Sequence, residues 1–311
     1  MNVVSKRKWY FLLSALVIVP CVISLIIPPA LKAGIDFSSG SAIEMTFIED
    51  ITEHEVRTAL GEIDHKESKV QQMDSRTVFI RTKELQEGEL QLIQAYLTDE
   101  VAEVTSVPNV DTVSPEVAGE TVRNAIIAVL VAALAILLFI SWAFRGIPNP
   151  LRYGVSALLA LFHDILIIIG IFSILGKVID FEVNAMLIVG LLAVAGYSVN
   201  DTIVVFDRIR ENVGRNIDRP LAESVNISIL ESMGRSLGTS CTTLFALVAL
   251  YFIGGATLKE FLLVLIIGTV VGTYSSIFIA AQFLVLWEQG EVGRFFEFLR
   301  LRRRRVRSST N

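Results

Sequence analysis

The chain has 311 residues, of which 53% are hydrophobic and 19% are charged, and its formal net charge is −5. A mean hydropathy of +0.60 excludes an ordinary soluble domain and indicates a membrane protein. The two cysteines and three histidines lie too far apart in the sequence to indicate a disulfide scaffold or a metal centre, and we expect no cofactor.

The chain starts with a basic cluster that is followed by an apolar stretch over residues 9–31. This stretch of 23 residues is longer than the core of a typical signal peptide, and no small-residue cleavage site follows it. We therefore expect a retained transmembrane helix. Pro20 is compatible with such a helix because neighbouring helices can satisfy the carbonyl group that proline leaves free.

Residues 32–123 are predicted to form a separate domain of the α+β class. Its predicted strands cover 41–48, 69–73, 76–81 and 101–113, and its predicted helices cover 52–62 and 87–97. The order βαββαβ is that of a ferredoxin-like fold, and Thr52 with Glu55 predicts a capping box. The domain has 19 Asp and Glu against eight Lys and Arg, so its surface does not favour nucleic acid or anionic lipid headgroups.

Five further apolar segments are long enough to cross a bilayer. They lie at about 124–144, 151–175, 184–206, 237–254 and 260–287. With the first helix they predict a polytopic α-helical protein of six transmembrane helices. The last five form a bundle over 124–287, which contains a loop at 207–236 and is followed by a basic tail at 288–311.

Basic residues indicate how the chain crosses the membrane. Of the 27 Lys and Arg, 17 lie in four segments, namely 1–8, 145–152, 207–236 and 288–311. The positive-inside rule places these segments and both termini in the cytoplasm, and the 32–123 domain outside. The arginines at 302–307 fit either a nucleic-acid or ribosome contact or a tail held to anionic membrane lipid, and we favour lipid.

Asp201 is an acidic residue inside the predicted span 184–206. An ionised Asp at the centre of a bilayer costs roughly 2.5–3.5 kcal/mol, so such a residue is a functional candidate by default. We interpret Asp201 as a proton-binding group, and we include the adjacent Asn200 as a secondary candidate on a proton path.

Arg235 lies at the start of the fifth predicted span, and two interpretations of it stay open. It is either the charged partner of Asp201 or a positive-inside anchor at the cytoplasmic edge. As a partner it stays charged while Asp201 gains and loses a proton, which gives an element with two states. The hydroxyl groups of Thr239, Ser240, Thr242 and Thr243 either line a proton route or bond back to their own helix.

Two further features of the spans also have two interpretations. His163 and Asp164, midway along the third span, form either a proton relay or a mutually satisfied polar pair that fixes helix packing. Gly268, Gly272, Ser276 and Ala280 place a small residue at every fourth position of the sixth span. This stripe predicts a close helix contact, either within the chain or with a partner.

No motif of an enzyme site is present. The chain has no Walker A sequence, no G-x-S-x-G and no H-E-x-x-H, so we expect that it is not an enzyme. Without a nucleotide site, energy must come from an ion gradient or a partner. One charge that crosses 100 mV supplies about 2.3 kcal/mol, which shifts a two-state equilibrium by nearly fiftyfold.

Five segments resemble SecF, the smaller subunit of the SecD–SecF accessory complex of bacterial protein export. They are Gly34-Ile35-Asp36-Phe37 with Gly40, Val113 with Pro115-Glu116-Val117, Leu161-Phe162-His163-Asp164, the long run Gly196–Asn212, and Gly268–Ala281. The chain departs from the family pattern at Ser38-Ser39-Gly40, where two glycines are usual, and at Ser114, where Gly is usual. These departures affect the loop geometry and leave the resemblance intact.

The resemblance implies an RND-superfamily fold in a bacterial plasma membrane and a partnership with SecD. It further implies that the complex uses the proton-motive force to help an unfolded polypeptide through the SecYEG channel, with YajC as a further candidate partner. Asp201 matches the proton-coupling acid of the family and Arg235 matches its partner.

Two other functions make different predictions. An RND-type proton-driven exporter of small molecules or lipids predicts an apolar pocket in the outer region. A passive subunit that only stabilises a partner predicts no response to the proton gradient.

Overall fold

The computed structural model describes residues 2–290, so the predicted basic tail lies outside the described residues from 291 onward. The chain divides into two compact units. One unit comprises the residues up to Leu31, Ala128–Phe181 and the residues from Met186 on. The other comprises Lys32–Ile127 together with Glu182–Ala185, the short segment that leads into a membrane helix.

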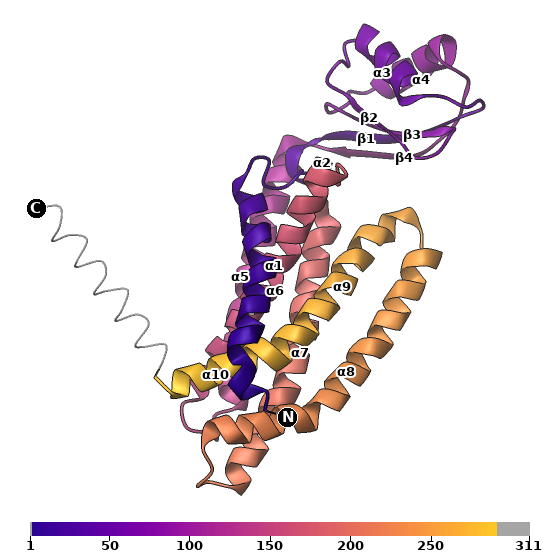
Figure 1. Cartoon of the computed structure of the whole chain (residues 1–311). Coiled ribbons are helices and arrows are strands. Elements are labelled where there is room, and N and C mark those ends of the chain that lie inside the picture. Colours follow the sequence, from indigo (N-terminus) through magenta and orange to yellow (C-terminus); the bar gives the residue numbers. More distant parts are fainter. Residues whose placement is uncertain (1, 291–311) are drawn as a thin grey trace, which may run out of the picture. The chain divides into compact units, whose positions relative to one another are not determined.

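The first unit is a bundle of long apolar helices (Figure 1). Its elements are η1 (Val4–Lys6), α1 (Arg7–Ile26), α5 (Pro115–Ala143), α6 (Pro150–Val178), α7 (Ala185–Arg215), α8 (Leu221–Ile253), α9 (Ala256–Ser275), η2 (Ser276–Ala280) and α10 (Ala281–Glu288), of which α5 and α7 begin in the other unit. Six helical stretches of the described residues are long and apolar enough to cross a membrane. The prediction of six spans is confirmed, and the chain is a multi-pass membrane protein.

Two predicted boundaries are wrong, for different physical reasons. α1 ends at Ile26 because Pro28 and Pro29 follow, and proline disfavours the helical conformation in the residue before it. The predicted loop 207–236 is helical except for residues 216–220. Hydropathy detects only the apolar part of a helix, and here polar side chains extend α7 and α8 beyond it.

Ion pairs and hydrogen bonds hold these polar helix ends together. Arg208 of α7 donates from Nε to Glu231 of α8 at 2.7 Å and also pairs with Glu211. The Asn212 amide donates to the same Glu231 carboxylate at 2.8 Å and to Ser228 Oγ at 2.9 Å. The ends of α7 and α8 are therefore fixed side by side next to a five-residue connection.

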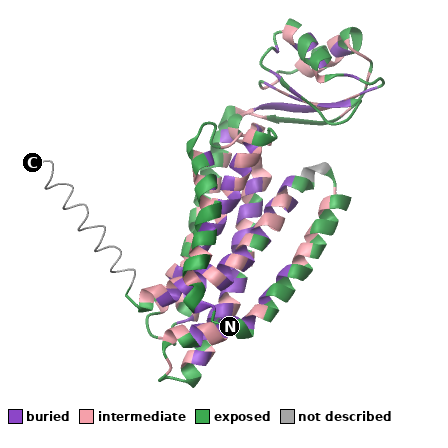
Figure 2. Cartoon of the chain, viewed as in Figure 1, coloured by how far each residue is buried: buried purple, intermediate pink, exposed green. Residues whose placement is uncertain are grey.

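Burial separates the central helices of the bundle from its outer ones. About half of the most apolar part of α6, of α7 and of the stretch Leu258–Glu288 is buried, against 11% for α8 and 6% for α5. Figure 2 shows the buried faces of α6, α7 and α9, whereas α8 is mostly exposed or intermediate. The chain alone therefore leaves α5 and α8 open to lipid or to another membrane protein.

The small-residue stripe of α9 and η2 lies against α7 of the same chain. A Cβ atom added to Gly268 would lie 2.1 Å from Val194 Cγ2, and one added to Gly272 would lie 3.0 Å from Ser198 Cβ. Ser276 donates from its hydroxyl to the Ser198 carbonyl at 3.1 Å. Because only glycine permits this approach, the stripe sets the distance between α7 and α9.

The second unit, called the outer unit below after its predicted location, contains a four-stranded antiparallel sheet in the order β2-β3-β1-β4. Its elements are α2 (Ile35–Ser38), β1 (Gly40–Phe47), α3 (Glu53–Glu62), β2 (Lys69–Gln72), β3 (Thr77–Thr82), α4 (Glu89–Glu100) and β4 (Val104–Val113). α3 and α4 cover one face of the sheet (Figure 1). The order of elements is the predicted βαββαβ, and the ferredoxin-like prediction is confirmed; only the single turn α2 was not expected.

Local sequence and packing agree in this unit. The Thr52 hydroxyl accepts from the Glu55 amide at 3.4 Å, and the Glu55 carboxylate accepts from the Thr52 amide at 2.9 Å. This is the predicted capping box, and it starts α3 at Glu53. Alternate residues of β1, such as Ile43 and Met45, are fully buried in the core beneath the two helices.

His65 makes the stability of this unit depend on pH. Its ring lies 7% exposed with Nδ1 at 2.8 Å from Thr82 Oγ1, and burial, aided by the nearby Lys83 charge, lowers its pKa. Because an unfolded His has a pKa near 6.5, the unfolded state binds the proton more readily, and stability falls as pH falls below about 6.5. We expect lower amide-exchange protection of β3 at pH 5.5 than at pH 7.5 in the full chain.

The variant His65→Gln is expected to show the same protection of β3 at pH 5.5 as at pH 7.5. His54→Gln, at an exposed position of α3, is the matched control and is expected to keep it. An unchanged difference in His65→Gln would show that another group senses the pH.

Candidate proton site in the membrane bundle

Asp201 lies on the buried face of α7, where its side chain is only 3% exposed. Its carboxylate accepts a hydrogen bond from Ser240 Oγ of α8 at 3.4 Å, and Ser240 lies 2.5 Å from Thr273 Oγ1 of α9. No Lys or Arg forms an ion pair with Asp201 within residues 2–290. A buried carboxylate without a counter-charge is unfavourable by several kcal/mol, so this acid requires either a proton or the approach of a cation.

Hydroxyl groups from three helices surround the acid. Tyr197, one turn before Asp201 on α7, donates to Ser240 Oγ at 3.5 Å and to Thr243 Oγ1 at 3.4 Å. Thr239 and Thr242 instead bond back to carbonyl groups of α8. Ser240 and Thr243 are therefore turned toward α7, and their role in a proton route stays a prediction.

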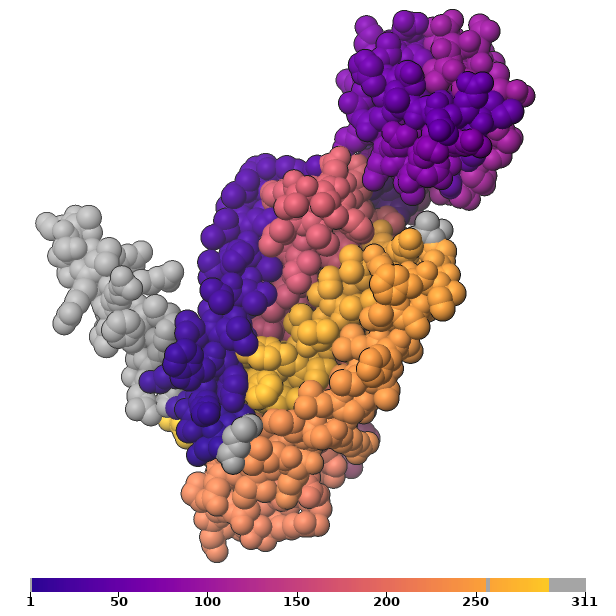
Figure 3. Space-filling view, turned by 45° about the vertical axis from the view of Figure 1, so that its right-hand side comes forward, coloured from indigo at the N-terminus to yellow at the C-terminus, as the bar shows by residue number. Residues whose placement is uncertain are grey.

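The structure does not bring Arg235 to Asp201. Arg235 is exposed on α8 and makes no ion pair with a described acidic residue. Figure 3 shows α8 lying beside α9 on this face of the bundle. It precedes Ser240 by five residues, which places it about 7.5 Å along the helix and roughly 140° around its axis. The pairing of Arg235 with Asp201 stays a prediction.

Asp164 is the second acid inside the bundle, and it is fully buried on α6. One carboxylate oxygen accepts from Ser198 Oγ of α7 at 2.6 Å and from Ser275 Oγ of α9 at 2.7 Å. The other lies 2.9 Å from His163 Nδ1. Asp164 thus has partners on both oxygens, which distinguishes it from Asp201.

His163 extends this network to α1. Its Nε2 atom lies 3.0 Å from Ser14 Oγ, and the Tyr274 hydroxyl, which accepts from Ser14 at 3.4 Å, donates to the Tyr10 carbonyl at 2.7 Å. The network therefore joins α1, α6, α7 and α9. This arrangement fixes helix packing and also forms a continuous line of groups able to pass a proton, so neither predicted role is excluded.

Asn200 lies on the opposite side of α7 from this network. Its side chain is exposed and has no hydrogen-bonding partner within the described part of the chain. Gly196 and Ala193, one and two turns before it, are exposed on the same face. A small, uncovered strip with an amide group is therefore available for contact with another membrane helix.

Sequence reasoning missed Ser198, Ser275 and Thr273, which provide the hydroxyl groups around the two acids. Ser and Thr in membrane helices commonly bond to their own backbone, so none of the three stands out in the sequence. The signal that was available is the spacing of Ser198 and Thr202, which puts both hydroxyls on the face of α7 that meets the small-residue stripe.

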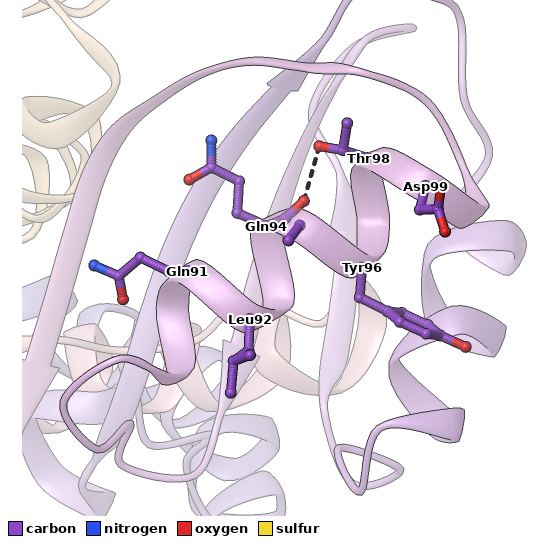
Figure 4. Close-up of a pocket in the computed structure, with 7 residues that line it drawn as sticks. Gln91, Leu92, Gln94, Tyr96, Thr98 and Asp99 are labelled. Atoms are coloured by element: carbon purple, nitrogen blue, oxygen red, sulfur yellow. Dashed lines mark hydrogen bonds between the residues drawn. The ribbon is translucent and has the colours of Figure 1, made fainter.

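The hollows on the outer unit do not resemble a binding pocket for an apolar ligand. One of them, of about 730 Å³, lies along α4 and is lined by Gln91, Leu92, Gln94, Ala95, Tyr96, Thr98 and Asp99. Figure 4 shows these side chains on one helix, with Thr98 bonded back to the Gln94 carbonyl. Within the described residues no group of three or more His, Cys, Asp or Glu side chains is placed to hold a metal ion.

Comparisons with known proteins agree with this geometry. Residues 93–290 match the family model described as protein export membrane protein SecD/SecF, C-terminal. The chain is 40% identical to protein translocase subunit SecF of Thermobaculum terrenum over 95% of its length and 96% of that protein. It is 36% identical to the subunit of the same name from Anaerolinea thermophila, over 96% of this chain and 97% of that one.

Solved structures give the same result. The fold matches the crystal structure of SecDF from Thermus, a translocon-associated membrane protein, with a TM-score of 0.81 and 32% identity. The match covers 93% of this chain and 39% of the SecDF chain. A second structure, SecDF in a super-membrane-facing form, matches with a TM-score of 0.66 and 30% identity. The chain therefore belongs to the SecF family of protein translocase subunits.

Proposed function

We propose that this chain works with SecD in a complex that uses the proton-motive force to assist protein translocation through the SecYEG channel. The observation that carries the proposal is Asp201, a buried acid in a membrane helix with one long hydrogen bond and no described counter-charge. A group of this kind changes its charge at low structural cost, because no ion pair has to be broken when a proton arrives.

Proton binding at Asp201 changes which groups it attracts. The neutral acid fits the hydroxyl cluster of Ser240, Thr273 and Tyr197, whereas the carboxylate attracts a cation. Arg235 is the cation on the neighbouring helix, and it reaches Asp201 only if α8 turns about its axis, because α8 now presents Ser240. Rotation of α8 is favoured as the moving step because only 11% of its most apolar part is buried.

A SecD helix is the proposed partner of the exposed strip on α7. In a bilayer, the amide of Asn200 gains by hydrogen bonding across helices, and the small side chains of Ala193 and Gly196 let a second helix approach closely. The SecDF structure supports this, since the match covers 39% of that chain and the rest of it is available to complete the assembly. We propose SecYEG, YajC and the translocating polypeptide as further partners of the complex.

We propose a bacterial plasma membrane as the location, with both termini in the cytoplasm. The ends of α7 and α8 near Arg208, Arg215 and Arg219, and the start of α6 at Arg152, are basic and follow the positive-inside rule. The exporter alternative predicts an apolar pocket, whereas the hollow along α4 has Gln91, Gln94 and Asp99 in its lining.

Arg235→Met is expected to lower proton-dependent export, because Met keeps the length of the side chain and removes the charge that would meet the Asp201 carboxylate. Arg235→Lys is expected to retain part of the activity. Export of a secreted reporter, at matched amounts of chain in the membrane, measures the effect.

Arg210→Met is the matched control, since Arg210 is a half-exposed arginine on α7 that pairs with Asp207 at 2.7 Å. Its export is expected to stay at the wild-type rate. Equal export by Arg235→Met and Arg210→Met would remove Arg235 from the mechanism and leave it as a positive-inside anchor.

A further inference from the structure

The segment Glu182–Ala185, which leads into α7, is held by the outer unit through backbone hydrogen bonds. The Val183 amide donates to the Lys32 carbonyl at 2.8 Å, and the Gly34 amide donates to the Val183 carbonyl at 2.7 Å. Val183 is 2% exposed and forms a parallel bridge with Ala33. A Cβ atom added to Gly34 would lie 2.8 Å from the Val183 carbonyl oxygen, so the close approach requires glycine at this position.

Arg81 of β3 strengthens this contact with a nearly buried guanidinium group. Its Nη1 atom donates to the Ala33 carbonyl at 2.8 Å and lies 2.6 Å from Glu182 Oε2, and Nη2 donates to Ser38 Oγ. The other oxygen of Glu182 lies 3.2 Å from Lys69 Nζ of β2. Only the planar fork of an arginine can make these contacts at once.

Asp36 completes the arrangement at the helix itself. Its Oδ2 atom accepts a hydrogen bond at 2.7 Å from the amide of Ala185, the first residue of α7. The first amides of a helix have no partner within it, and a carboxylate there is favourable because of the helix dipole. The start of α7 is therefore capped by a residue that lies 149 positions earlier in the chain.

We infer that Asp36, Arg81 and Glu182, called the clasp below, are positioning residues that fix the start of α7 to the outer unit. Asp201 lies 16 residues after Ala185 on the same helix, about 24 Å along it. The clasp gives the helix that carries Asp201 a fixed starting point, so a change of charge at Asp201 is coupled to export only while the clasp holds the amide of Ala185. This role rests on the proposed function of Asp201.

The capping residue provides the sharpest test, because Asn keeps the acceptor that Asp36 supplies and Ala does not. In cells that depend on this chain for export, Asp36→Ala is expected to lower export about fivefold. Asp36→Asn is expected to stay within about twofold of the wild type. Equal export by the two variants, at matched amounts in the membrane, would overturn the role of the cap.

A reversible cross-link tests whether the clasp stays closed. Ala33→Cys with Val183→Cys joins two paired backbone segments, in a chain whose Cys21 and Cys241 are replaced by Ala. Neighbouring strands lie about 4.8 Å apart, within the range of a disulfide. Export is expected to be the same with the cross-link oxidised or reduced. Loss of export on oxidation and recovery on reduction would show that the clasp opens, against the inference.

Sensitivity to an uncoupler separates a positioning role from simple loss of structure. In Asp36→Ala the remaining export that needs this chain is expected to be insensitive to the proton gradient. Export that is lowered but equally sensitive would contradict the inference. Asp201→Asn is measured in parallel. If Asp201→Asn exports normally and Asp36→Ala does not, the proton mechanism is wrong and the role of the clasp is retained. If Asp36→Ala exports normally and Asp201→Asn does not, only the role of the clasp is overturned.

Discussion

Asp201→Asn is expected to abolish the part of protein export that depends on both this chain and the proton gradient. Asn fills nearly the same volume and still accepts from Ser240, so packing of α7, α8 and α9 is retained while the titrating group is lost. Each coupled proton supplies about 2.3 kcal/mol per 100 mV, so its loss removes a bias of nearly fiftyfold. Pulse-labelled export of a secreted reporter, with and without an uncoupler, measures the effect.

Asp207→Asn is the matched control, because Asp207 is an exposed acid six residues further along α7. It is expected to export like the wild type and to remain sensitive to the uncoupler. Full gradient-dependent export by Asp201→Asn would show that this carboxyl group is not the coupling group. If the uncoupler lowered none of the export that needs this chain, even in the wild type, the chain would be a passive subunit that stabilises its partner.

Gly268→Ala is expected to destabilise the bundle by about 3 kcal/mol, the largest effect on stability of any single methyl group added to α9. The added Cβ would lie 2.1 Å from Val194 Cγ2 and 2.7 Å from Cγ1, and Val194 is itself 1% exposed and has no free space to move into. The midpoint of thermal unfolding of the purified chain in detergent measures the loss.

Gly238→Ala on α8 is the control, because an added Cβ there meets no atom within 4 Å and alanine favours the helix. The double variant Gly268→Ala with Val194→Ala removes the two methyl groups that clash and is expected to recover most of the stability. Equal destabilisation of the single and double variants would place the close contact of α9 elsewhere than on α7.

The fold was predictable from the sequence wherever local pattern and tertiary packing agree. The strand and helix order of the outer unit follows from alternation over Gly40–Phe47 and from the Thr52–Glu55 capping box, both of which act over a few residues. The membrane spans follow from apolar length. The helical start of α8 was missed, because it is stabilised by ion pairs such as Arg208 with Glu231, which hydropathy cannot detect.

The candidate site was predictable only in part. Asp201 and Asp164 are conspicuous because an acid in an apolar segment is costly, but their partners come from helices whose rotation no local pattern fixes. Ser240 therefore occupies the place expected for Arg235. The clasp was missed for a similar reason, since Asp36 and Ala185 are joined only by the folding of the chain.

Proton flux through the complex tests the central claim most directly. The chain is reconstituted with SecD in liposomes that carry a pH gradient and an internal pH-sensitive dye. We expect wild type and Asp207→Asn to dissipate the gradient and Asp201→Asn to hold it at the level of empty liposomes. Flux through Asp201→Asn at the wild-type rate would show that protons cross without this carboxyl group, and the mechanism built on it would be wrong.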